Sequence, residues 1–161
     1  MTGRVTLEIV AILAVATVIS GTILALFALT DSVDPVGTLV DQVPRVLFGL
    51  LGLAWGLWLI MLIIGAIAHR YRAVGWRIGT HIVSLAVALI INVLVVSVAS
   101  FIGAGGSDWE LLIVGILVAV SGVLFFSGVV AVLVVELLIV RPRQMMRDET
   151  VSAAQGEHPS G

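Results

Sequence analysis

Four long apolar runs divide this chain of 161 residues, and they constrain its fold more than any other feature. A helix needs roughly 20 apolar residues to cross the hydrocarbon core of a bilayer. Because that core offers no water to the backbone, each run must pair its own N–H and C=O groups, so each is expected to be α-helical. The expected spans cover residues 5–29, 46–68, 78–102 and 110–140.

The composition points to a membrane as the solvent of these runs. Charged residues make up only 11% of the chain and the mean hydropathy is +1.23, whereas about 25% of a soluble domain is charged. Too few polar side chains exist to cover a soluble surface, which excludes an ordinary soluble enzyme and a disordered chain. The formal net charge of −2 argues against nucleic-acid binding, and the absence of cysteine excludes disulfides and thiolate metal sites.

The arginines predict how the spans are oriented. Lysine is absent, and only Arg45 falls on one side of the expected spans. The other seven arginines fall on the opposite side: Arg4, Arg70, Arg72, Arg77, Arg141, Arg143 and Arg147. Basic loops stay in the cytoplasm, which places both termini on the inner side. We therefore expect an all-α membrane protein, a four-helix transmembrane bundle running up-down-up-down over residues 1–140, with an unfolded polar tail over residues 141–161.

The segment between the first two spans carries a helix-start signal. Asp34 followed by Pro35 is typical of an N-cap and a first helical residue. Val36, Leu39 and Val40 then share one apolar face. A short helix on the outer membrane surface and an irregular loop are both compatible with this pattern.

Three ionisable residues, Glu8, His81 and Glu136, lie about one turn inside the inner ends of their spans. Ionisable residues within spans are functional candidates by default, which favours a layer that handles protons or cations. The alternative is that they reach the interface and pair with nearby arginines. Arg4 stands four residues before Glu8, and Arg77 stands four residues before His81.

The inner loop over residues 69–77 mixes cations with two aromatic residues, as headgroup-level anchors do. Its arginines, Arg70, Arg72 and Arg77, are candidates for contact with anionic lipid headgroups or a partner, at about 1 kcal/mol per charge. His69 and Arg70 are also candidate partners of the ionisable layer. The alternative is that the loop only sets the topology.

Asn92 lies near the middle of the third span, at a depth similar to Thr17, Ser20 and Ser121. Such residues either form a small polar binding site or act as interhelical hydrogen-bonding groups.

A glycine stripe, Gly49, Gly52 and Gly56, follows the second span at spacings of three and four residues. Small residues at this spacing allow helices to approach closely, either within the bundle or between copies of the chain.

No catalytic motif occurs, and the three histidines do not form a local ligand set, so we expect no enzyme activity, cofactor or metal. Four spans also occur in the small multidrug exporters, but these carry a functional glutamate well inside the first span, whereas Glu8 lies near its edge. The chain resembles small four-span membrane proteins of haloarchaea, including the structural membrane proteins of haloarchaeal pleomorphic enveloped viruses. The four spans, the inner arginine loop and the short polar tail carry this resemblance.

The resemblance implies a membrane-associated matrix in the virion, with the basic loop facing the genome. We therefore expect a structural, matrix-like or accessory protein of a plasma or virion membrane. Its expected partners are the bilayer and either further copies of this chain or another membrane protein. The alternative is a small oligomeric transporter or channel that uses Glu8, His81, Asn92 or Glu136.

Overall fold

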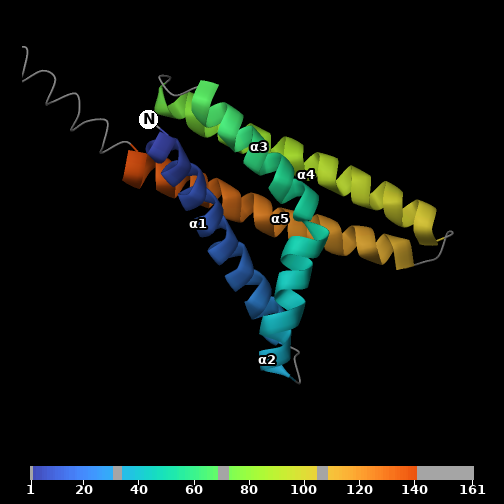
Figure 1. Cartoon of the computed structure of the whole chain (residues 1–161). Coiled ribbons are helices and arrows are strands. Elements are labelled where there is room, and N and C mark those ends of the chain that lie inside the picture. The colour runs from blue at the N-terminus through green and yellow to red at the C-terminus, as the bar shows by residue number, and fades with distance from the viewer. Residues whose placement is uncertain (1, 31–33, 69–72, 105–108, 141–161) are drawn as a thin grey trace, which may run out of the picture.

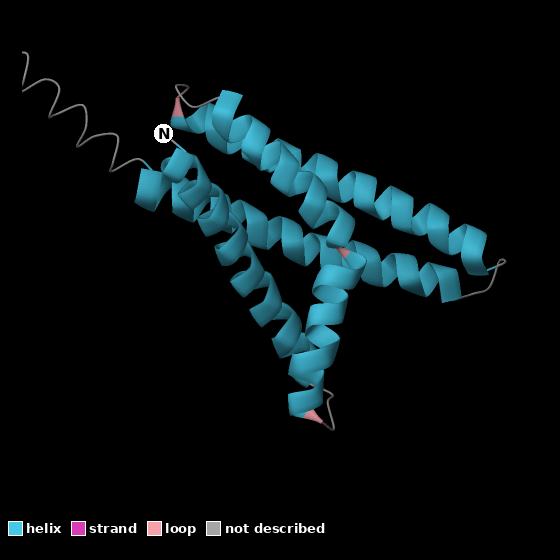
Figure 2. Cartoon of the chain, viewed as in Figure 1, coloured by secondary structure: helices cyan, strands magenta, loops and turns pink. Residues whose placement is uncertain are grey.

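The structure, a computed structural model, describes residues 2–30, 34–68, 73–104 and 109–140 (Figure 1). Within these ranges the chain is helical and contains no strand, which confirms the all-α class (Figure 2). The long helices are α1 (Thr2–Leu29), α3 (Gly52–Ala68), α4 (Val74–Ala104) and α5 (Trp109–Val135). The shorter elements are α2 (Pro35–Gly37) and three wider π-helical segments, η1 (Thr38–Gln42), η2 (Arg45–Leu50) and η3 (Glu136–Val140).

Three helical stretches, Val5–Leu29, Val74–Ile102 and Leu111–Leu138, are long and apolar enough to cross a membrane. A fourth is a bent pair, Pro35–Leu50 and Gly52–Ala68, whose halves meet at 59°. The described chain therefore has three candidate spans, or four if the bent pair is one span. A continuous second helix over residues 46–68 was expected, and that expectation is wrong.

The helix break is centred on Leu51, whose φ of −108° and ψ of 9° are not helical. The segment before the break contains Pro44, which has no N–H to donate and crowds the carbonyl four residues earlier. Widening of the helix into the π form on both sides of Pro44 relieves this crowding. At Leu51 the direction of the chain changes and α3 begins.

The segment after α1 begins as the sequence predicted. The Asp34 carboxylate accepts a hydrogen bond from the Gly37 N–H at 3.1 Å, and Pro35 is the first helical residue. Helical structure then runs beyond the predicted loop to Leu50, so the irregular-loop alternative is wrong. Val36 and Val40 are exposed rather than packed against the rest of the chain.

The helices converge at one end of the molecule, where α1 and α4 begin and α3 and α5 end (Figure 1). We call this the cluster end. At the opposite end, α1 and the helical segment 35–50 diverge from α4 and α5. Helix α5 packs against both α1 and α4, and α4 packs against α3. The apolar core therefore lies among these four helices.

One glycine allows a close contact among three helices, and the sequence analysis missed it. A Cβ atom on Gly128 of α5 would lie 2.3 Å from Leu85 Cδ2 and 3.2 Å from Trp58. Both of these side chains are fully buried. Gly128 thus allows α3, α4 and α5 to meet.

The glycine stripe of Gly49, Gly52 and Gly56 packs against no other helix in the part of the chain that the structure describes. No heavy atom lies within 4 Å of a Cβ built on any of the three. The helix break also separates Gly49 from the other two. The prediction that this stripe packs within the bundle is therefore wrong. Its role in self-association stays a prediction.

Candidate functional site

Four ionisable side chains from three helices meet inside the cluster end: Glu8 of α1, Arg77 and His81 of α4, and Glu136, the first residue of η3. We call these four residues the charge cluster. Their exposed fractions are 5%, 3%, 1% and 0%. These positions are distant in the sequence, so only the tertiary fold assembles the cluster.

The two carboxylates of the charge cluster share one guanidinium group. Arg77 Nη2 donates a hydrogen bond to Glu8 Oε1 and lies 3.0 Å from Glu136 Oε1. His81 Nε2 lies 3.6 Å from the same Glu8 oxygen and 3.8 Å from the same Glu136 oxygen. The imidazole and the guanidinium therefore approach the same two oxygens.

Local helix geometry explains how each member is positioned. Arg77 and His81 are four residues apart, which places both on the same face of α4. Glu136 stands where α5 changes to the π form, a change that turns the following side chains relative to an α-helix. On the α3 side, a Cβ atom on Gly65 would lie 3.5 Å from the His81 ring, so glycine lets α3 approach this ring.

The cluster confirms part of the sequence interpretation and corrects another part. Glu8, His81 and Glu136 do come together, as the interpretation of an ionisable layer expected. Glu8 and Glu136 also pair with Arg77, which confirms in part the alternative of pairing with nearby arginines. The prediction that Arg77 contacts lipid headgroups is wrong, because its guanidinium is buried between the two carboxylates. The physical reason is that buried carboxylates need a nearby positive charge.

Other predicted partners lie outside the described residues. These are His69, Arg70 and Arg72, together with the side chain of Arg4. Headgroup contact by Arg70 and Arg72 therefore stays a prediction.

The hydrogen-bonding capacity of the charge cluster is far from used. Five of its polar atoms have no hydrogen-bond partner among the described residues: both Glu136 oxygens, both His81 ring nitrogens and Arg77 Nε. If the imidazole is neutral and both carboxylates are ionised, two negative charges face one guanidinium, and the cluster is one positive charge short of neutrality. An uncompensated charge is costly where water is absent. In that charge state, one further proton or cation would make the cluster neutral.

Asn92 forms a second buried polar feature, at the helix break. Its side-chain Oδ1 accepts a hydrogen bond from the Ala54 N–H at 3.2 Å, and its Nδ2 donates to the Leu50 C=O at 3.1 Å. The side chain is fully buried. Asn92 thus pairs two backbone groups that the break removes from the helix ladder, which confirms its role as an interhelical hydrogen-bonding residue.

The hydroxyl groups expected at the same depth behave differently. Thr17 and Ser20 donate to carbonyls of their own helix at 2.7 Å. Ser121 is buried, and its hydroxyl has no partner among the described residues. Of the four residues expected in a polar layer, Asn92 is therefore the one whose hydrogen bonds reach another helix among the described residues.

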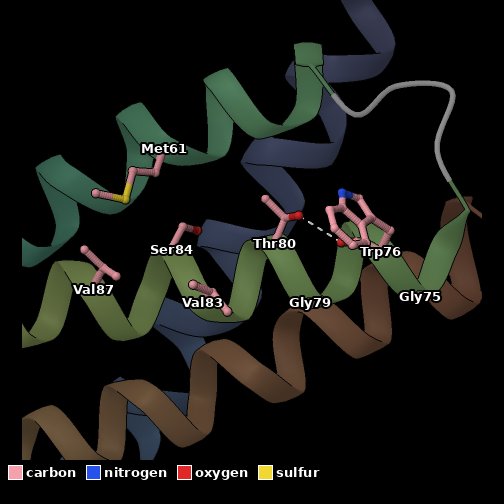
Figure 3. A pocket seen from close by; sticks show the side chains of 8 residues that line it. All are labelled: Met61, Gly75, Trp76, Gly79, Thr80, Val83, Ser84 and Val87. Atoms are coloured by element: carbon pink, nitrogen blue, oxygen red, sulfur yellow. Dashed lines mark hydrogen bonds between the residues drawn. The ribbon is translucent and has the colours of Figure 1, made fainter.

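A groove of about 540 Å³ lies between α3 and the first half of α4 (Figure 3). Met61 lines it from α3, and Val83 and Val87 line it from α4. Thr80 also lines it and donates a hydrogen bond to the Trp76 C=O at 2.9 Å. The groove is mainly apolar and contains no member of the charge cluster.

Comparisons with known protein families, with characterised proteins and with solved structures found no match to this chain. The resemblance to structural membrane proteins of haloarchaeal viruses stays a prediction.

Proposed function

We propose that this chain is a non-enzymatic integral membrane protein that binds and releases a proton at the charge cluster, as the proton-handling part of a small transporter or channel. The observation that carries this proposal is the burial of two carboxylates, one imidazole and one guanidinium among membrane-compatible helices. Ionisable residues buried in such helices are rare, and they are functional candidates by default because they mark ion pathways and proton relays.

The topology that goes with this proposal has four spans and both termini inside. The distribution of arginines supports that orientation, with the bent pair as the second span. The charge cluster then lies near the inner face, one helical turn from water. A proton would need only a short path between the cytoplasm and Glu136.

The charge balance favours a proton as the ligand. One added proton, on the imidazole or on a carboxylate, makes the cluster neutral. Proton binding also requires no displacement of Arg77, which already contacts both carboxylates. Stability alone is a weaker explanation, because buried ion pairs replaced by apolar residues often leave a protein equally stable.

A structural or matrix-like role is the second candidate, and the glycine stripe favours it. Gly52 and Gly56 lie open on α3, next to exposed Leu53, Leu59 and Ile60. Such a surface suits lateral packing with other copies in a membrane.

Infrared difference spectroscopy on the protein in vesicles tests proton binding without knowledge of a substrate. We expect a carboxyl or imidazole signal that titrates with pH and is lost in Glu136→Gln or His81→Gln. The matched control is Glu110→Gln, in the first turn of α5 at the opposite end of that helix. Proton flux in the same vesicles should decrease in Glu8→Gln and Glu136→Gln and stay unchanged in the control.

Two results would contradict this proposal. One is a wild-type protein whose cluster shows no titrating signal and whose vesicles show no proton flux. The other is a variant with all four cluster residues made apolar that keeps the wild-type flux. A folded, inactive protein that assembles into a stoichiometric lattice would favour the structural role.

A further inference from the structure

The charge cluster contains the donor atoms of a metal site. Glu8, His81 and Glu136 each offer one ligand atom, and these atoms all lie within 4.8 Å of one another. The His81 side chain is 1% exposed, and neither of its ring nitrogens has a hydrogen-bond partner among the described residues. Its Nε2 atom lies near one oxygen of each carboxylate without a hydrogen bond to either.

The distances are close to those of a tetrahedral site. Ligand atoms about 2.0–2.2 Å from a zinc ion are about 3.3–3.6 Å from one another. His81 Nε2 lies 3.6 Å and 3.8 Å from the Glu8 and Glu136 oxygens. A contraction of a few tenths of an ångström would bring the imidazole to ligand spacing from each carboxylate oxygen. The two oxygens lie within 4.8 Å of one another, so they would have to approach by at most about 1.5 Å to share an ion, with a fourth position left for water.

The guanidinium of Arg77 now takes the place of such an ion. Its Nη2 atom contacts the same oxygens of Glu8 and Glu136 that the metal would use. Exchange of this single charge for a divalent ion changes the cluster from one negative charge to neutral. The exchange therefore removes the net negative charge of the cluster, provided that the Arg77 side chain can leave.

Arg77 lies close to the end of its helix. It lies in the first turn of α4, which begins at Val74 at the cluster end. A long arginine side chain can lie along apolar surface and place its charged group at the membrane interface. Its departure would leave the two carboxylates and the imidazole free to coordinate.

We propose that Glu8, His81 and Glu136 bind a divalent transition-metal ion of the zinc class, and that the ion displaces the Arg77 guanidinium. One imidazole and two carboxylates suit Zn²⁺, Co²⁺ or Mn²⁺ better than Mg²⁺ or Ca²⁺, which prefer oxygen ligands alone. This inference uses the same residues as the proton proposal but does not rest on proton flux. Protons and the metal compete for the same donors, so metal affinity falls as the pH is lowered.

Calorimetry with ZnCl₂ on the full chain in lipid nanodiscs tests the site. The background variant carries His69→Asn and His158→Asn, which leaves His81 as the sole histidine. We expect one Zn²⁺ per chain and at least a tenfold loss of affinity in Glu8→Gln, His81→Gln and Glu136→Gln. Glu110→Gln, the matched control, should bind as the background does.

The exchange with Arg77 has its own test. Arg77→Gln removes the competing cation, so its Zn²⁺ affinity should increase at least tenfold and Zn²⁺ should raise its Tm more than that of the background. If this variant does not fold, the absorption spectrum of Co²⁺ bound to the background protein still reports tetrahedral coordination with a nitrogen ligand.

Several outcomes would overturn the inference. These are equal Zn²⁺ affinity in the background and in Glu136→Gln, an octahedral Co²⁺ spectrum unaffected by His81→Gln, and reduced affinity in a folded Arg77→Gln protein. Loss of proton flux in metal-free vesicles would leave the metal site standing, and loss of metal binding would leave the proton proposal standing. The two proposals can therefore fail separately.

Discussion

Substitution of Asn92 by leucine removes a side chain that bridges the helix break. Leucine has a similar size but can neither donate to the Leu50 C=O nor accept from the Ala54 N–H. The change therefore removes both hydrogen bonds while largely preserving the packing volume. The two backbone groups at the break lose their partners in a buried place.

The expected loss follows from these two bonds. Interhelical hydrogen bonds in membrane proteins contribute about 0.6 kcal/mol on average and about 1.7 kcal/mol at most. A buried backbone group left without a partner costs about 1–3 kcal/mol. Because the helix end can relax and recover part of this, we expect Asn92→Leu to lower the free energy of unfolding by about 1–3 kcal/mol.

Reversible unfolding in mixed micelles of detergent and dodecyl sulfate measures this change. Hydrogen exchange supplies a local readout, because the Ala54 amide should exchange faster once its acceptor is gone. The matched control is Ser121→Ala, which removes a buried hydroxyl that has no partner among the described residues. That control should stay within about 0.5 kcal/mol of wild type.

The reasoning would be refuted by an Asn92→Leu protein as stable as Ser121→Ala. Unchanged exchange at the Ala54 amide would refute it independently. Either result would mean that the break satisfies its backbone groups without Asn92.

Three further substitutions test other parts of the structure. Gly128→Ala should lower the free energy of unfolding by about 1–3 kcal/mol, since the added methyl group overpacks the contact of three helices. The control Gly115→Ala should not lower it, because its Cβ would meet open space. Equal losses for the two variants in unfolding titrations would contradict the packing at Gly128. Asp34→Ala should weaken the helix start by about 0.5–2 kcal/mol, and hydrogen exchange at Gly37, the amide that Asp34 caps, should show it; unchanged exchange would rule out the cap. Arg77→Gln should lower the free energy of unfolding by about 3–5 kcal/mol in metal-free vesicles, because it leaves two buried carboxylates without a positive partner. A free energy of unfolding equal to that of wild type would show instead that the cluster is hydrated.

The sequence predicted the features that depend on local chemistry. Each apolar run became a helix because its backbone groups pair within the segment, although the second run is interrupted at Leu51. The cap at Asp34 needed only a side chain three residues from its partner. The fixed spacing of an α-helix likewise placed Arg77 and His81 on one face. These features involve neighbours along the chain, which is why the sequence was sufficient.

The sequence alone determined a chain of apolar helices with ionisable residues near the ends of three of them. Only the tertiary structure decided that Glu8, Arg77 and Glu136 share one buried contact, that three helices pack closely at Gly128, and that Asn92 supports a broken helix. These outcomes depend on how the helices rotate and approach one another. Helix spacing fixes which residues share a face, but the partner of that face depends on contacts among all the helices at once.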